Sequence, residues 1–181
     1  LTLQNGGQVE TDALVVGSSG HLLGQGTVQA GFANIWGEVA PGVNIALPSS
    51  APGVASLAVV SPGTLVISSS VALTETAVIA LDIHALDSYD QLVIDGTAEL
   101  AGQLILHFGE GFAPQQADVF NFIQTGGATG SFADVVITGL APGFEYDLAL
   151  TNGVVTLTAL NDGVPTTQPS PADLFLPLVM R

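Results

Sequence analysis

Glycine and proline interrupt this sequence every few residues, and this punctuation limits its fold more than any other feature. With 22 Gly and 10 Pro among 181 residues, no long stretch keeps the hydrophobic period of a helix. Between the interruptions lie short runs rich in Val, Ile, Leu and Thr, including 64–68, 77–83 and 103–107. Such runs, separated by turn pairs like Asn152-Gly153, are typical of strands and hairpins. The sequence therefore predicts an all-β chain.

The spacing of these runs changes along the chain. Residues 1–42 consist of very short apolar pieces separated by Gly, which suits the rungs of a β-helix, and the later runs are longer. We interpret residues 1–160 as one β-helical, all-β domain with a strand-rich C-terminal half. Residues 43–62, which are small, Pro-containing and uncharged, are predicted to be an insertion loop within it. Residues 161–171 have the composition of a linker, and residues 172–181 form an apolar tail strand.

Five short motifs stand out in the later part of the chain: Tyr89-Asp90-Gln91-Leu92, Asp95-Gly96-Thr97-Ala98, Gly111-Phe112-Ala113-Pro114, Phe120-Asn121-Phe122-Ile123 and Gly130-Ser131-Phe132. With these motifs, most of the chain, from about residue 26 to residue 160, resembles bacterial autotransporter-like β-helix passengers. The resemblance extends to their surface repeats and not to their membrane barrel. It implies a right-handed parallel β-helix (a β-solenoid), export, and adhesion or surface scaffolding, and it supplies no catalytic residues. For residues 63–160 a β-sandwich or jelly roll remains an alternative, because hairpin strands and parallel rungs have similar patterns at this length.

The charge of the chain restricts its partners. The sequence has sixteen Asp and Glu, one Arg and no Lys, for a formal net charge of −15. Nucleic-acid binding requires Lys and Arg along the phosphates, so we expect no nucleic-acid partner. No apolar run reaches the roughly 18 residues of a membrane helix, so no membrane insertion is expected. The high negative charge favours solubility and makes association sensitive to acid or divalent cations.

The densest group of ligand-type side chains consists of Asp82, His84, Asp87 and Asp90. Asp82 and His84 are two residues apart and would share one face of a strand. Ca²⁺ is the cation that such oxygen ligands favour, but its sites normally gather more oxygens in a tight loop. We therefore predict no resident metal or other cofactor. A solvated strand end is the simpler interpretation of this group.

Catalytic arrangements are not evident in the sequence. The carboxylates of Asp90, Asp95 and Glu99 could pair as in glycoside hydrolases, but related enzymes on β-helices use Arg or Lys beside the carboxylates. His21, His84 and His107 are scattered, and no nucleophile-elbow motif accompanies them. We predict that the chain is not an enzyme, with a polysaccharide-active enzyme as the minor alternative.

The tail is the segment most suited to self-assembly. Its residues alternate so that one face of an extended strand would be wholly aliphatic. After a linker, such a strand could cover the core of its own chain or add to a neighbouring subunit, and head-to-tail addition gives open filaments. A signal for sorting or anchoring is a third alternative. The predicted self-assembly residues are Leu174, Phe175, Leu176, Leu178, Val179 and Met180.

These observations predict an extracellular structural protein of the bacterial cell surface. Its main partner would be itself, in a head-to-tail homopolymer that forms a fibre, matrix or surface layer. The alternative is a monomeric adhesin or carbohydrate-binding module with extracellular polysaccharide as partner, which an aromatic groove around Trp36 and Tyr89 would favour. Phe120 and Phe122, by contrast, alternate as the inward face of a strand should, and we predict them to be core.

Overall fold

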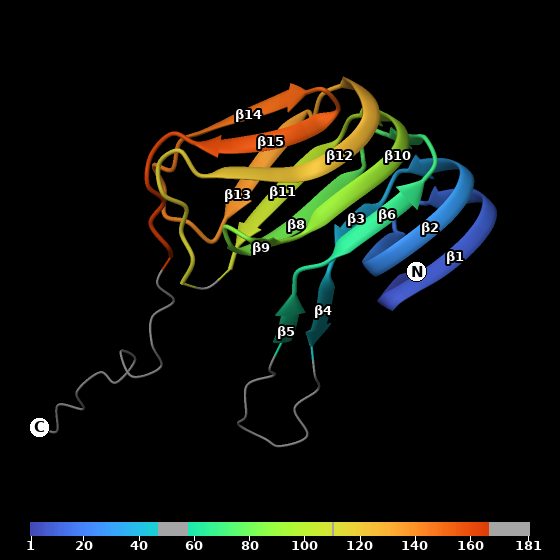
Figure 1. Ribbon diagram of the computed structural model, residues 1–181, viewed down its shortest axis with the longest axis horizontal. Coiled ribbons are helices and arrows are strands. Elements are labelled where there is room, and N and C mark those ends of the chain that lie inside the picture. The colour runs from blue at the N-terminus through green and yellow to red at the C-terminus, as the bar shows by residue number, and fades with distance from the viewer. Residues whose placement is uncertain (47–57, 110, 167–181) are drawn as a thin grey trace, which may run out of the picture.

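The computed structural model describes residues 1–46, 58–109 and 111–166. In this part of the chain there are strands and no helix, which confirms the predicted all-β class (Figure 1). The strands are β1 (Thr2–Val16), β2 (His21–Ile35), β3 (Glu38–Pro41), β4 (Val43–Ala46), β5 (Ala58–Ser61), β6 (Thr64–Ser68), β7 (Val71–Leu73), β8 (Val78–Ala85), β9 (Ser88–Tyr89), β10 (Gln91–Leu100), β11 (Gln103–Phe108), β12 (Val119–Gly130), β13 (Asp134–Thr138), β14 (Tyr146–Thr151) and β15 (Val154–Ala159).

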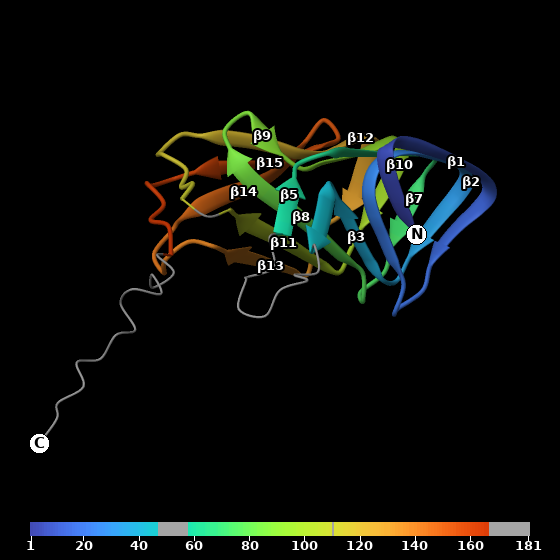
Figure 2. The ribbon, with the colours of Figure 1, turned by 90° about the horizontal axis from the view of Figure 1, so that it is seen from below.

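Parallel pairing joins most of these strands into two ladders. In one ladder β1, β2, β6, β10 and β12 follow one another, and β7 pairs with both β2 and β10. In the other ladder β3, β8, β11 and β13 follow one another. The pairing of β2 with β3 joins the ladders into one sheet. Figure 2 shows the second ladder from below, with its strands side by side.

The register of these ladders explains the core. Val28, Ile67 and Ile94 lie level with one another on β2, β6 and β10, and all are buried. Val39 and Ile79 are paired in the same way in the second ladder and are also buried. Side chains alternate between the two faces of a strand, so the in-register stacking places aliphatic residues of successive strands in continuous inward columns. Each such buried side chain contributes roughly 1.5–3 kcal/mol relative to an exposed one.

The last part of the chain changes to antiparallel pairing. β12 pairs with β15, and β15 pairs with β14, both antiparallel. The β14–β15 connection confirms the hairpin predicted at Asn152-Gly153, where both residues have the positive φ angles of 52° and 79° that such a turn requires. Phe120 and Phe122 are fully buried with their rings stacked, which confirms their predicted place in the core.

Residues 43–62 leave the ladders at Gly42 and return at Gly63. The described parts of this segment, β4 and β5, pair with each other in a separate antiparallel sheet of two strands. Residues 47–57, the rest of the predicted insertion loop, lie outside the described residues. The segment therefore begins and ends at one place on the ladders, the joint between Gly42 and Gly63, which lie next to each other.

Close stacking at one corner between β1 and β2 requires glycine. Gly24 has a φ of 102°, and a Cβ at this position would collide with the backbone carbonyl of Leu3. Gly6, in the neighbouring turn of β1, also has a positive φ of 74°, but a Cβ there would meet nothing within 4 Å. The two positions share the strain of an unfavourable φ, and only Gly24 adds a backbone collision.

We therefore expect Gly24→Ala to destabilise the protein more than Gly6→Ala. The left-handed φ should cost each variant about 1–2 kcal/mol, and the collision should add about 1–3 kcal/mol for Gly24→Ala. Urea unfolding followed by circular dichroism measures the difference. Equal midpoints for the two variants would show that β1 does not stack on β2 at this distance.

Candidate functional site

The open edge of β1 is the main feature that the fold leaves without a partner. Among the described residues β1 pairs only with β2, in continuous parallel register from Gly7 to Val16. The amide of Trp36 donates to the carbonyl of Val16, so Val16 faces β2. The backbone N–H and C=O groups of successive residues point to alternate sides of a parallel strand. The N–H and C=O groups of Val15 and Ala13 therefore point toward the open edge. The Ala13 carbonyl accepts a hydrogen bond from the Thr11 hydroxyl at 3.1 Å, consistent with this orientation.

Few of the usual edge protections are present on β1. Natural edge strands are commonly blocked by Lys, Pro, inward charges or bulges. β1 contains no Lys or Pro, and its irregularity lies between Leu3 and Gly7, before the regular part of the strand. Only the carboxylates of Glu10 and Asp12 place charge on the regular part. The regular part of β1 is thus available for pairing with another strand.

The opposite end of the molecule has shorter edges. There the sheet ends in β13 and β14, which have five and six residues and, within the described ranges, pair only with β11 and β15. Figures 1 and 2 both place β1 and the β14–β15 hairpin at opposite ends of the long axis. Polar contacts hold this end together, including a 2.7 Å hydrogen bond from the Gln116 amide to the Asp162 carboxylate.

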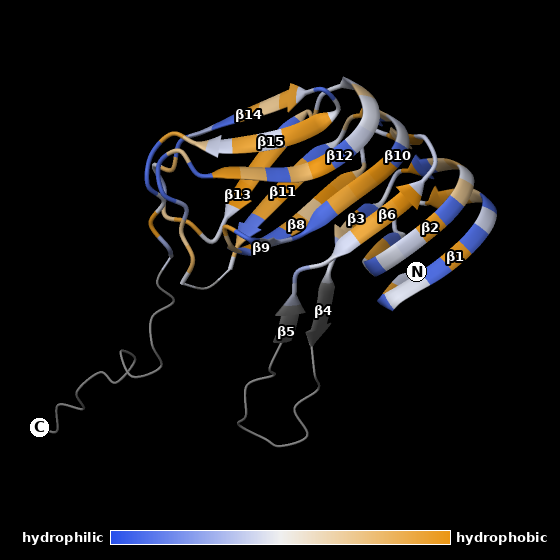
Figure 3. Cartoon of the chain, viewed as in Figure 1, coloured by the Kyte–Doolittle hydropathy of each residue, from blue (hydrophilic) through white to orange (hydrophobic). Residues whose placement is uncertain are grey.

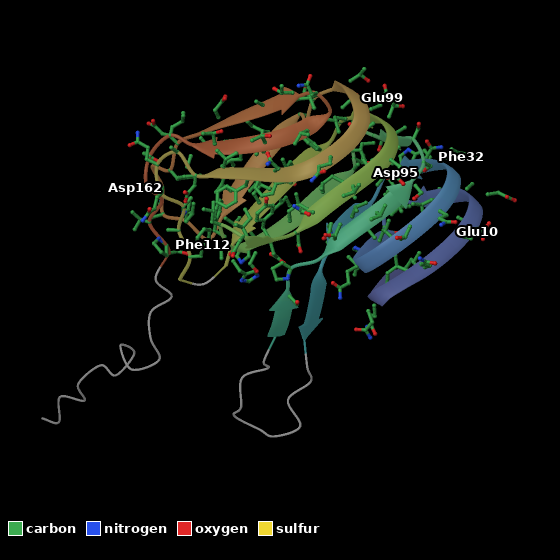
Figure 4. The ribbon with its side chains drawn as sticks, in the orientation of Figure 1. Glu10, Phe32, Asp95, Glu99, Phe112 and Asp162 are labelled. Atoms are coloured by element: carbon green, nitrogen blue, oxygen red, sulfur yellow. The ribbon has the colours of Figure 1, made fainter. Side chains whose placement is uncertain are left out.

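Exposed apolar side chains gather at the same two ends. At the β1 end Val15 is 59% exposed and Phe32 is 50% exposed. Figure 3 shows the hydropathy of these strands, and Figure 4 labels Phe32 near the β1 end and Phe112 and Asp162 near the other. Apolar side chains at both ends would be removed from water if one copy met the next end to end. The exposed large apolar residues are Leu1, Val15, Phe32 and Trp36 at the first end, Val119, Leu150, Leu160 and Val164 at the second, and Leu86 in the turn after β8.

Polar and acidic side chains lie in outward columns between these ends. Glu10, Gln29 and Ser68 are level with one another on successive strands. The Ser68 hydroxyl continues the column by donating to the carboxylate of Asp95 on β10 at 2.7 Å. With a net charge of −15 and no Lys, such carboxylates repel a second copy until salt or acid weakens them.

The residues predicted as metal ligands are distributed over β8 and the turns after it. Asp82 and Asp90 are neighbours: each backbone amide donates to the other residue, Asp82 N to the Asp90 carboxylate at 3.0 Å and Asp90 N to the Asp82 carbonyl at 2.9 Å. The ring of His84 lies against Gly109, and Asp87 is an exposed turn residue. Over the described ranges no group of three or more His, Asp or Glu side chains is arranged to hold a metal ion.

Asp90 is the buried carboxylate of the described chain, with 1% of its surface exposed. Its Oδ1 accepts from the Gly63 amide at 2.8 Å, and Gly42 packs directly against the same oxygen. One carboxylate thus joins β8 to the point where residues 43–62 leave and rejoin the ladders. Burial raises the pKa of Asp90 to about 7, and the charge of Asp82 makes a smaller contribution in the same direction. The backbone hydrogen bonds from Asp82 and Gly63 act in the opposite direction and lower the pKa. Sequence reasoning missed this joint, because it depends on contacts between residues 27 positions apart.

The predicted aromatic groove is not formed by its two named residues together. Tyr89 packs edge-on against Phe120 and Phe122 and lines a shallow pocket with Pro62 and Gln91. Trp36 does not line that pocket, and lies in the turn after β2 with 38% of its surface exposed. Of the three carboxylates considered for catalysis, Asp90 is buried, whereas Asp95 and Glu99 are exposed along β10.

No protein-family model matches the chain, and no curated protein matches it significantly. In the part of the chain that the structure describes, no helix has the length and apolar character needed to cross a membrane. The predicted self-assembly residues Leu174, Phe175, Leu176, Leu178, Val179 and Met180 lie outside the described residues. The candidate site therefore rests on the geometry of the ladders.

Asp90 should make stability depend on pH in an unusual direction. Its pKa rises from 3.8 to about 7 on folding, so the folded state binds the proton more tightly than the unfolded state. The stabilisation is complete below pH 3.8 and is lost as the pH rises through 7, by up to about 1.4 kcal/mol per pH unit. Asp90→Asn cannot titrate, and its amide keeps only one of the two acceptors. We expect the variant to be less stable than the natural chain at pH 4–5, with the difference shrinking by pH 8.

Chemical unfolding between pH 4 and 8 measures this difference. Asp95→Asn, which changes an exposed carboxylate on a neighbouring strand, is the control and should retain the natural pH profile. If Asp90→Asn lowered the free energy of unfolding more at high pH than at low pH, the raised pKa of Asp90 would be contradicted. Such a result would mean that the charged carboxylate is the stabilising form.

Proposed function

We propose that this chain is a structural module of the bacterial cell surface that joins end to end with further copies of itself. The observation that carries the proposal is the asymmetry of its ends: a long, unblocked strand edge with exposed apolar side chains at β1, and shorter edges with a second set of exposed apolar side chains at the opposite end. Contacts between two different ends are heterologous, and they generate open filaments unless the rotation closes a ring.

The proposed architecture is a right-handed parallel β-helix closed at one end by an antiparallel hairpin. Two parallel ladders with inward aliphatic columns support it, as does the resemblance of Tyr89-Asp90-Gln91-Leu92 and the following motifs to autotransporter-like passengers. The same resemblance supports export to the cell surface. Each repeat of such a solenoid contacts only its neighbours, so a further strand can be added at an open end without rearranging the rest.

The proposed contact combines backbone pairing with apolar burial. The open amides and carbonyls around Val15 would pair with a strand of the next copy, as in other strand-addition complexes. Phe32 and Trp36 would lose their exposure in the same contact. Repulsion between the carboxylates of two copies would oppose association. Because salt screens this repulsion and mild acid removes charge, assembly should increase under both conditions. No catalytic step and no cofactor is part of this function.

A second candidate function, binding of neutral carbohydrate, is supported by one surface groove. Its volume is about 600 Å³, and it crosses β2, β7, β10 and β12. Phe32 and Asn34 line the groove on β2, and Glu99 lines it on β10 across β7. An exposed aromatic ring, an amide and a carboxylate in one groove suit stacking and hydrogen bonding to sugars. Retention of the chain on insoluble neutral glycan, lost in Glu99→Ala while assembly persists, would favour this function.

The end-to-end contact should depend on the backbone of Val15. Val15→Pro removes the amide that we place on the open edge, whereas Val15→Thr keeps this amide and replaces one methyl group of the side chain by a hydroxyl. We expect the natural chain and Val15→Thr to form filaments in negative-stain microscopy at raised salt, and Val15→Pro to stay monomeric. Since this chain has a single Trp, the fluorescence of Trp36 should also become protected from a soluble quencher on assembly.

Unfolding curves of the two variants check that Val15→Pro remains folded. Filaments of Val15→Pro equal to those of Val15→Thr would exclude the β1 edge as the contact. Monomers for every chain between pH 4 and 8, with and without added Ca²⁺, would remove the assembly proposal and leave carbohydrate binding as the better candidate.

A further inference from the structure

A second groove lies on the face formed by the second ladder, the β3 ladder of β3, β8, β11 and β13. Its volume is about 320 Å³. Its apolar floor comes from Leu23, Ala40, Ala80 and Ile105, one side chain from each of β2, β3, β8 and β11. Figure 2 shows the last three of these strands side by side. The groove thus crosses the strands and runs along the axis of the ladder.

Carboxylates flank this apolar floor. Glu38 lines the groove on β3, where its Oε2 lies 2.6 Å from Nδ1 of His21, and Asp82 lines it on β8. His107, the register partner of Asp82 on β11, is the other titratable residue of the lining, and its Nδ1 lies 2.9 Å from the Thr138 hydroxyl. An apolar floor between two acids fits a ligand with aliphatic side chains and a cationic group.

The described chain leads directly to one end of this groove. Thr166, the last described residue, donates its amide to the Gly139 carbonyl at 2.9 Å. Gly139 follows Thr138, the hydrogen-bond partner of His107 in the groove lining. Residues 167–181 continue from this point. They contain the alternating Leu174, Leu176, Leu178 and Met180 and the single cation of the chain, Arg181.

We propose that residues 172–181 dock in this groove of their own chain. The aliphatic side chains cover the Ala80–Ile105 floor, and the guanidinium of Arg181 lies beside Glu38. The fifteen residues after Thr166 can span at most about 50 Å, whereas the five strands β11, β8, β3, β2 and β1 that line the groove cover about 19 Å at the usual strand spacing. The short tether gives the segment a high effective concentration at its own groove, which favours it over the tail of another copy.

This inference does not depend on the end-to-end assembly proposed above. It gives the apolar tail a place in the groove, which reaches β1 only at Thr2 and Gln4, before the regular part of the open edge from Gly7 to Val16. Docking removes both the aliphatic side chains of the tail and the apolar floor from water, and it brings Arg181 to a groove whose charged side chains are the carboxylates of Glu38 and Asp82. The proposed occupant and the groove are therefore complementary in apolarity and charge.

A single reporter thiol tests the docking, because the chain has no Cys. Ala80→Cys places a thiol on the groove floor, and Ala72→Cys places one on β7 in the other groove, at an equally half-buried position. Each is introduced into the full chain and into a full chain carrying Leu176→Asp and Leu178→Asp. The rate of reaction with a soluble maleimide is measured at a concentration where light scattering shows monomers.

We expect the thiol at position 80 to react about tenfold more slowly in the chain with the natural tail, as when about a tenth of the molecules are open. The thiol at position 72 should react equally in both chains. A synthetic peptide of residues 172–181 should restore the protection in the Asp-substituted chain, and a peptide carrying the two Asp residues should not. Glu38→Arg should weaken the protection, and Arg181→Glu combined with it should recover part of the loss.

Equal rates at position 80 with and without the tail substitutions would overturn the docking. Protection that grows with protein concentration would also overturn it, because it would assign the tail to another copy. Both outcomes are independent of Val15→Pro and of filament formation, so the docking and the assembly can fail separately.

Discussion

The rest of this structure depends on the in-register parallel pairing of successive strands. Each strand satisfies its backbone groups with the strand before it and the strand after it, and it places its aliphatic residues over those of its neighbours, as Val28, Ile67 and Ile94 do. Parallel pairing of this kind does not terminate by itself, because each added strand leaves a new row of unpaired backbone groups on its outer edge. The two ends therefore have to be considered separately from the body. At β12 the chain changes to antiparallel pairing with β15, and the β14–β15 hairpin follows. At β1 no such change occurs.

The charge of the chain acts on this architecture in two opposite ways. On the outer columns, carboxylates such as Glu10 and Asp95 are hydrated and keep separate molecules apart. Inside, Asp90 has lost its hydration and is held at the joint of residues 43–62 by the Gly63 and Asp82 amides. Acid therefore weakens the repulsion between molecules and strengthens the joint within each molecule. Mild acidification should favour compact chains that associate, rather than the unfolding that acid causes in many proteins.

The sequence predicted the class of the fold and one turn well, and it predicted little of the site. Local chemistry was sufficient for the hairpin at Asn152-Gly153 and for the alternation of Phe120 and Phe122, because both depend on residues close together in the chain. The sequence predicted very short apolar pieces separated by Gly in residues 1–42, whereas β1 runs without a break from Thr2 to Val16 through Gly6 and Gly7. Glycine usually interrupts strands, but here the adjacent strand supplies hydrogen bonds that single-strand propensity does not include. The Asp90 joint and the two grooves come from residues far apart in sequence, so no local pattern could have indicated them.

The apolar side chains beside the β1 edge and the apolar tail of residues 172–181 need not serve the same contact. A strand edge is recognised mainly through backbone groups, so almost any extended segment can pair with it, and specificity must come from the side chains beside the edge. At β1 these side chains are Val15, Phe32 and Trp36. The groove of the β3 ladder would select mainly through apolar contact and charge, which suits a short segment whose only cation is Arg181. If that segment is held on its own chain, its aliphatic surface is hidden from the free edges of other copies. The proposed end-to-end contact would then depend on the β1 edge and the opposite end alone, without a contribution from the tail.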